Sequence, residues 1–288
     1  MSRVVYVNGR YLAHAAAAIH VEDRGYQFAD GVYEVISVYD GRLVDAKAHH
    51  DRLDRSLGEL EIAPPMSRLA LGHVLREVLR RNRLSRGILY VQMTRGVAKR
   101  DHAFPHETST SVVVTARRGG QPRPDALETG VEIVLVPETR WARCDIKSVS
   151  LLPNVLAKQH AKSLGAFEAW FVEGNGAVTE GSSTNAWIVD GDGNLVTRDL
   201  HAGILSGVTR NAVVDLAARE GVKIVERAFT ADEARAAPEA FLTSTTSFVM
   251  PVVRIDGDPV ADGRPGVLTR KLQALYDGHF RGVGRNAI

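Results

Sequence analysis

The order of the predicted strands and helices limits the possible folds most strongly. Runs of β-branched and aromatic residues, typical of strands, occur in both halves of the chain, and so do stretches with helical apolar spacing. These segments do not alternate as regular strand–helix–strand units. An α/β protein with mixed α+β sheets in two domains therefore fits better than a single Rossmann unit or TIM barrel.

The first half of the chain predicts two hairpins, two helices and two further strands. Asn8-Gly9 lies between two short apolar runs and favours a type I′ turn. Asp40-Gly41 follows a run of β-branched and aromatic residues at 32–39 and predicts the turn of a second hairpin. Apolar periodicity predicts helices at 50–62 and 67–84, and strands are expected at 88–94 and 111–116.

A break in the pattern separates the two halves. Residues 117–125 contain Gly-Gly and two prolines, and the pattern restarts after them. We expect a smaller N-terminal domain at 1–118, a linker at 119–126 and a larger C-terminal domain at 127–288. Two domains also agree with the number expected for a chain of 288 residues. The second half predicts strands at 131–136, 169–172, 186–189, 241–244 and 249–255, helices at 155–164, 207–220 and 267–280, and a short helix after a capping box at Thr230.

Charge and cysteine content narrow the classes of partner. Lys plus Arg number 36 against 34 for Asp plus Glu, so a net charge of +2 favours neither a nucleic-acid nor a membrane-surface partner. No apolar run approaches the ~20 residues of a membrane helix. Because Cys144 is the only cysteine, we expect a reducing, cytoplasmic setting. Common motifs for phosphate loops, dinucleotides, zinc, other metals and serine hydrolases are absent from the sequence.

Three segments of the second half carry candidate chemistry. Lys147 lies in a locally apolar stretch, where it is either a surface lysine or a desolvated amine able to form a Schiff base. Glu180 stands among small hydroxyl residues, which suits either a polar loop or a buried acceptor for a ring N–H. Ser206 precedes an amphipathic helix, where it fits an N-cap, while the helix start also suits a phosphate. An amine, a carboxylate and a phosphate site together indicate pyridoxal 5′-phosphate (PLP).

The chain also resembles the fold-type IV PLP enzymes, and among them is most similar to the D-amino-acid aminotransferases. The resemblance covers almost the whole chain. It is carried in family order by F-A-D-G-V-Y-E-V (28–35), H-H-D-R-L (49–53), R-G-V-A-K-R-D-H-A-F-P (95–105), R-W-A-R-C-D-I-K-S (140–148), N-V-L-A-K-Q (154–159), V-T-E-G-S-S-T-N (178–185), G-I-L-S-G-V-T-R (203–210) and T-S-T-T-S (243–247).

The resemblance assigns a role to individual residues. Lys147 corresponds to the Schiff base lysine that then moves the α-proton, Glu180 to the acid at the pyridine nitrogen, and Arg140 to the residue holding that acid. Leu205 corresponds to the apolar platform beneath the cofactor ring. The phosphate cup is matched by Arg52, Gly207, Val208, Thr209 and Thr245. Without the resemblance, Arg52 reads as a solvated arginine at a helix start.

The resemblance also bears on the substrate. Tyr33, Arg100 and His102 match a trap for the substrate carboxylate, since the arginine fork and the two ring groups can grip a carboxylate together. Otherwise 99–102 is a basic, solvated loop, and Asp101 could pair with Arg100. In the family the arginine and histidine reach the neighbouring subunit's site, which implies a homodimer. The resemblance also implies that the cofactor lies between the two domains of each chain.

The expected activity is transamination of a D-amino acid such as D-alanine with 2-oxoglutarate or pyruvate. Other fold-type IV activities share the same chemistry: branched-chain L-amino-acid aminotransferase, (R)-amine transaminase and aminodeoxychorismate lyase. A catalytically inert PLP carrier or phosphometabolite-binding protein is the alternative from another class. It would need the phosphate cup but not Lys147.

Overall fold

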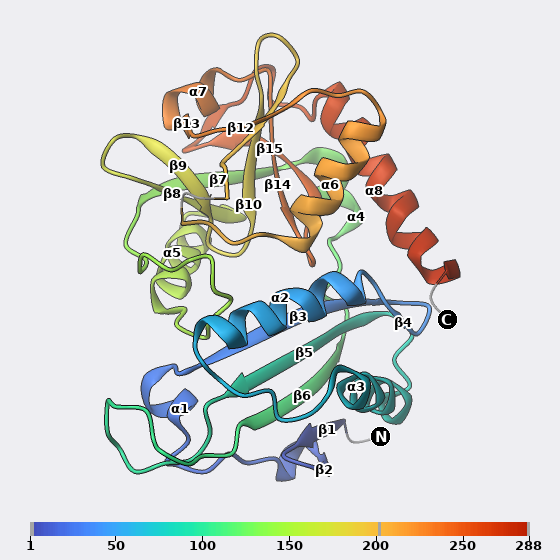
Figure 1. Ribbon diagram of the computed structural model, residues 1–288. Coiled ribbons are helices and arrows are strands. Elements are labelled where there is room, and N and C mark those ends of the chain that lie inside the picture. The colour runs from blue at the N-terminus through green and yellow to red at the C-terminus, as the bar shows by residue number, and fades with distance from the viewer. Residues whose placement is uncertain (1–2, 201–202, 287–288) are drawn as a thin grey trace. The chain divides into compact units, whose positions relative to one another are not determined.

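The computed structural model describes residues 3–200 and 203–286, and it contains mixed helices and strands (Figure 1). The chain divides into two compact units. Among the described residues, the first holds 3–120, 146–150 and 283–286, and the second holds 121–145, 151–200 and 203–282. The segment Ile146–Ser150 differs from the expected boundaries, because its backbone bonds to the first unit's sheet and Ile146 is buried in that unit's core.

Both predicted hairpins are present in the first unit. β1 (Val4–Val7) pairs with β2 (Arg10–Ala13), and Asn8 and Gly9 have φ of 44° and 89°, as a type I′ turn requires. β3 (Gly31–Tyr39) pairs with β4 (Arg42–Leu43) across a turn whose two residues also have positive φ. The turn chemistry in the sequence therefore predicted both hairpins correctly.

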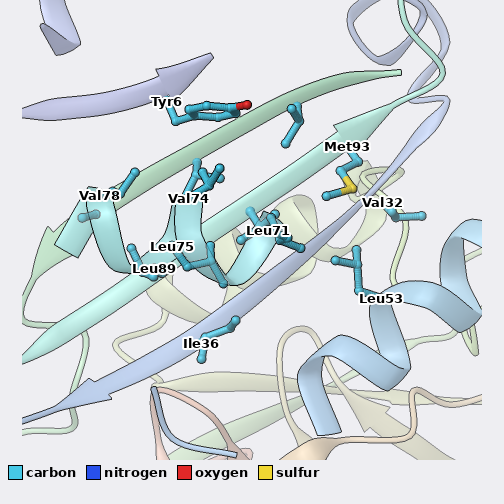
Figure 2. Packing of buried hydrophobic residues seen from close by; sticks show 14 of the residues in the cluster. Tyr6, Val32, Ile36, Leu53, Leu71, Val74, Leu75, Val78, Leu89 and Met93 are labelled. Atoms are coloured by element: carbon cyan, nitrogen blue, oxygen red, sulfur yellow. The ribbon is translucent and has the colours of Figure 1, made fainter. Parts of the chain in front are cut away.

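The sheet of the first unit has the order β2-β1-β6-β5-β3-β4, with β5 at Gly87–Thr94 and β6 at Ser111–Arg118. Helices α2 (Ala46–Glu59) and α3 (Arg68–Asn82) contribute to one apolar core with these strands. Figure 2 shows Leu71, Val74, Leu75 and Val78 of α3 in this core with Leu89 of β5. Burial of each such side chain contributes roughly 1.5–3 kcal/mol.

Two short helices of this unit were not predicted. They are η1 (His14–Ala16) and α1 (Arg24–Phe28). α1 begins after Asp23, whose carboxylate accepts a hydrogen bond from the Gly25 N–H at 2.9 Å. Five residues are too few to show an apolar period, so only the capping residue marked α1 in the sequence.

The second unit is built on a larger mixed sheet. Its order is β12-β11-β10-β14-β15-β7-β8-β9-β13, with β16 on β15; the β7–β8, β7–β15 and β11–β12 pairs are parallel. The strands are β7 (Val131–Pro137), β8 (Glu168–Val172), β9 (Ala177–Gly181), β10 (Asn185–Val189), β11 (Leu195–Thr197), β12 (Ile224–Glu226), β13 (Phe229–Thr230), β14 (Glu239–Ser244), β15 (Phe248–Ile255) and β16 (Asp258–Pro259).

The helices of this unit are α4 (Pro124–Thr129), α5 (Leu152–Ser163), α6 (Val208–Arg219), α7 (Ala231–Ala236) and α8 (Val267–Asn286). The predicted capping box is present at α7, where Thr230 and Glu233 exchange both hydrogen bonds. Pro153 lies in the first turn of α5, where its missing N–H costs no helical hydrogen bond. In the described chain, no helix is long and apolar enough to cross a membrane.

Candidate active site

Lys147 is held in the first unit by its backbone. Its carbonyl accepts a hydrogen bond from the Tyr33 N–H at 3.0 Å, and its own N–H donates to the Ser56 hydroxyl at 3.2 Å. The next residue, Ser148, forms an isolated bridge with Val32. The segment is thus attached to β3, and Lys147 stands beside a strand rather than inside one.

The Lys147 amine lies over an aromatic pair. Its Nζ is 4.3 Å from the centroid of the Tyr33 ring, and that ring stacks on Tyr90 at 5.6 Å. The Tyr90 hydroxyl donates to Gln92 Oε1 at 2.8 Å. Burial, together with the neighbouring Tyr33, raises the pKa of Tyr90 to about 12. Tyr90 therefore stays protonated at neutral pH and keeps its role as a hydrogen-bond donor.

Arg52 belongs to a buried group with Glu34 and His49. Its Nε and Nη2 donate to the two Glu34 oxygens at 2.7 and 2.8 Å, and His49 Nδ1 lies 2.7 Å from Oε2. Burial raises the pKa of Glu34, but the Arg52 charge and the hydrogen bonds from Arg52 and His49 outweigh it and lower the pKa to about 2. Burial lowers the pKa of His49. Glu34 thus fixes the direction of the Arg52 guanidinium.

Arg100 and His102 come together on one aromatic ring. Arg100 Cζ is 4.6 Å from the centroid of Phe28, and the His102 ring is 5.3 Å from it. Tyr33 makes its ring contacts with Tyr90 and Lys147 instead. The Asp101 carboxylate accepts a hydrogen bond from the Ala103 N–H at 3.1 Å, so it is engaged within its own loop.

Glu180 lies on β9 in the second unit and is buried. Arg140 Nη1 donates to its Oε1 at 2.5 Å, Asn185 Nδ2 to its Oε2 at 3.0 Å, and the Leu205 N–H reaches both oxygens at 3.2 and 3.3 Å. Each of these donors favours the ionised carboxylate. The carboxylate is held on three sides by groups from different segments.

Arg140 is shared with a second carboxylate, Glu138. Its Nε and Nη2 donate to the two Glu138 oxygens at 3.0 and 2.7 Å, and the Thr179 hydroxyl adds a bond at 2.8 Å. Burial raises the pKa of Glu138, but the Arg140 hydrogen bonds and charge outweigh it and lower that pKa. Burial lowers the pKa of Arg140, but Glu138 and Glu180 together raise it. The guanidinium therefore stays charged and holds both carboxylates.

The expected cap of α6 is one residue out of place. Gly207, not Ser206, is the N-cap, and it offers no side chain to the first turn of the helix. The Ser206 hydroxyl instead accepts a hydrogen bond from Asn211 Nδ2 at 3.1 Å. A Cβ on Gly207 would lie 2.1 Å from Asn185 Oδ1, so only glycine fits beside the asparagine that holds Glu180.

The remaining predicted cup residues lie close to this helix start or to the adjoining strands. Val208 and Thr209 form the first turn of α6, and the Thr209 hydroxyl is 3.3 Å from that of Tyr276. Thr245 lies in the turn between β14 and β15. β14 pairs with β10, with Thr243 opposite Asn185, so this turn leaves the sheet near the asparagine.

Comparison with known proteins gives the family. The model of the family "Amino-transferase class IV" matches residues 31–255. The chain belongs to this family. It is 39% identical to a D-alanine aminotransferase of Staphylococcus aureus (strain MSSA476), with 95% of this chain and 96% of the relative covered. It is also 39% identical to that of Bacillus licheniformis, with 93% and 94% covered.

Solved structures agree with this assignment. The branched-chain amino acid aminotransferase of Escherichia coli superposes with a TM-score of 0.90 at 26% identity, covering 98% of this chain and 96% of that chain. That of Thermoproteus uzoniensis gives 0.86 at 27% identity, with the same coverage. The chain is therefore a fold-type IV, PLP-dependent aminotransferase.

The residues of this class IV aminotransferase fit the cofactor that its family uses. The first unit provides the amine of Lys147 and the oriented guanidinium of Arg52. The second provides the buried Glu180 and a helix start whose cap, Gly207, carries no side chain. A carboxylate with three donors suits a ring N–H, and a helix of twelve residues with such a start suits a phosphate.

Around the predicted site residues, sequence reasoning missed Glu34, which contacts Arg52, His49, which contacts Glu34, and Glu138, which contacts Arg140. Glu34 carried a usable signal, because a charged residue inside an apolar strand run is costly to bury without a partner. His49 lies three residues before Arg52, on the same helix. Glu138 gave only a weak signal, two positions before Arg140 at the end of a predicted strand.

Proposed function

We propose that the protein transfers amino groups from D-amino acids such as D-alanine to a 2-oxo acid such as 2-oxoglutarate or pyruvate. The observation that carries this proposal is the identity to D-alanine aminotransferases over nearly the full length of both chains. The sequence motifs, including the Arg100 and His102 pair, support it as well.

When bound, PLP supplies an aldehyde for the substrate amine and an electron-withdrawing ring beside Cα. We assign to Lys147 the Schiff base with this aldehyde. With the substrate amine in its place, the free Nζ would take the proton from Cα of the substrate and deliver it to C4′, the aldehyde carbon of the cofactor. Its position beside Tyr33 and the attachment of its backbone to β3 keep the amine in one place for both transfers.

Glu180 holds a proton at the ring nitrogen in this proposal. An ionised carboxylate next to that nitrogen stabilises its protonated form, and the three donors keep the carboxylate ionised and fixed. Leu205 contributes its side chain as the apolar platform beneath the ring. Arg140 acts through Glu180 and does not touch the reacting atoms.

The phosphate of the cofactor is assigned to the start of α6 and to Arg52. Gly207, Val208 and Thr209 offer backbone N–H groups at the positive end of the helix. Thr245 adds a hydroxyl from the β14–β15 turn. The two Glu34 hydrogen bonds hold the Arg52 guanidinium in one orientation, which reduces the entropy lost when an anion binds.

The α-carboxylate of the substrate is assigned to Tyr33, Arg100 and His102. A carboxylate held on one side of the cofactor leaves a single Cα hydrogen facing Lys147, and this determines which enantiomer reacts. As in the family, we propose that the chain works as a homodimer in which Arg100 and His102 serve the neighbouring subunit. The single cysteine supports a cytoplasmic enzyme.

A branched-chain L-amino-acid aminotransferase is the second candidate, because the solved structures named above have that activity. A steady-state assay with 2-oxoglutarate separates the two. We expect rapid formation of pyruvate from D-alanine and much slower turnover of L-leucine and L-valine. Faster turnover of the L-amino acids would favour the second candidate.

A further inference from the structure

Arg24 is a buried arginine whose side chain faces backbone carbonyls of a distant loop. It lies on α1, is 3% exposed, and donates to the carbonyls of Asp101 at 2.6 Å, Ala103 at 3.3 Å and His102 at 3.4 Å. Figure 1 shows the long loop after β5 running beside α1. One guanidinium thus binds three consecutive peptide groups around His102.

The same helix provides the ring on which the loop's cationic side chains rest. Phe28 is four residues after Arg24, so both side chains project from one face of α1. Arg24, Arg100 and His102 all contact this ring, with distances to its centroid of 4.9, 4.6 and 5.3 Å. The backbone and the side chains of the loop are therefore fixed by the same short helix.

Asp30 connects Arg24 to a second buried arginine, Arg95. Asp30 Oδ2 accepts from Arg24 Nε and from Arg95 Nε, both at 2.8 Å. Arg95 starts the loop, is buried, and lies 3.6 Å from the centroid of Phe104. Asp30 therefore links Arg95, at the beginning of the loop, to Arg24, which binds the middle of the loop. Its carboxylate also neutralises part of the charge of the two buried arginines.

We propose that Arg24 is a positioning residue for recognition of the substrate carboxylate: it sets the backbone of 101–103 and thereby the placement of Arg100 and His102. This inference rests on the proposed function, in which those two side chains bind the carboxylate. Residues 101–104 are exposed, so without Arg24 their carbonyls can bond to water and the loop can move. A lysine keeps the charge beside Asp30, but its single ammonium lacks the planar fork that spans three carbonyls.

The test is a kinetic comparison of Arg24→Lys with the wild-type holoenzyme. We expect KM for D-alanine to rise about tenfold, with kcat and PLP affinity within about twofold, because only substrate binding depends on the loop. Arg81→Lys is the matched control. It makes the same change at an arginine that lies over Tyr11 and pairs with Glu77, outside the loop, and its KM should not change.

A double-mutant cycle with Arg100→Ala separates positioning from a general structural effect. If Arg24 acts through Arg100 and His102, Arg24→Lys should raise KM by no more than about threefold in the Arg100→Ala background. An equal factor in both backgrounds overturns the inference. An unchanged KM in Arg24→Lys, with KM raised in Arg100→Ala, overturns the inference alone; an unchanged KM in Arg100→Ala overturns the proposed carboxylate site as well.

A second variant decides the matter if Arg24→Lys does not fold. Phe28→Leu keeps an apolar side chain on α1 but removes the ring that Arg100 and His102 contact. We expect KM for D-alanine to rise about threefold, with kcat unchanged. An unchanged KM in this variant overturns the inference.

Discussion

At the residue scale, Arg140 is shared between two carboxylates that the proposed function treats differently. Glu180 is assigned to the ring nitrogen, whereas Glu138 bonds to Arg140 and Thr179. Glu180→Gln should lower kcat at least about a hundredfold, because a neutral amide does not stabilise the protonated nitrogen. Glu138→Gln makes the same change at a carboxylate that reaches Glu180 only through Arg140, and we expect kcat to fall by less than about tenfold. Equal losses in the two variants would contradict the role given to Glu180.

Glu34 should make the stability of the protein depend on pH. Its pKa is lowered from 4.5 to about 2, so its stabilising effect is fully present above about pH 4.5 and is lost as the pH falls toward 2. The shift corresponds to about 3 kcal/mol, at 1.36 kcal/mol per pKa unit. Urea unfolding at several pH values should show that the free-energy gap between wild type and Glu34→Gln narrows across this range. A gap that stays constant down to pH 2 would contradict the prediction.

At the element scale, the start of α6 depends on one glycine. Gly207→Ala would place a Cβ 2.1 Å from Asn185 Oδ1, so the asparagine must shift and its bond to Glu180 weakens. We expect a fall in PLP affinity of at least about tenfold, measured by equilibrium dialysis. Gly58→Ala is the control, since Gly58 lies in α2 and a Cβ there would meet nothing within 4 Å apart from its chain neighbours and the backbone of its own helix. That change should stabilise the fold by roughly 0.4–1 kcal/mol without altering PLP affinity.

The elements that the sequence predicted correctly are those with strong local signals. The turns at Asn8-Gly9 and Asp40-Gly41 and the capping box at Thr230 are present because each depends on neighbouring residues. The strand at Ala177–Gly181 was not predicted, and Glu180 was left open as part of a polar loop or as a buried acceptor. The partners of the buried Thr179 and Glu180 are Glu138 and Arg140, about forty positions away, so no local pattern could decide between the two. The predicted N-cap of α6, Ser206, was wrong by one residue. The cap is Gly207, and glycine is required there because Asn185, which is distant in the sequence, leaves no room for a side chain.

At the scale of the whole molecule, the proposed chemistry is divided between the two units. Lys147 and Arg52 belong to the first, whereas Glu180 and the start of α6 belong to the second. No local pattern could predict that Ile146–Ser150 joins the first unit, because this depends on hydrogen bonds to Gly31, Tyr33 and Ser56. The family resemblance covered both units, and for that reason it could propose roles for residues that periodicity alone left open.

The most direct test of the proposed function is a single-turnover reaction of the purified holoenzyme. D-alanine and L-alanine are each mixed with the enzyme without an oxo acid, and the near-visible absorbance of the bound cofactor is followed. L-leucine is added as a third donor. We predict rapid loss of the band with D-alanine, little change with either L-amino acid, and no such band in Lys147→Ala. Faster loss with L-leucine or L-alanine than with D-alanine would contradict a D-amino-acid aminotransferase.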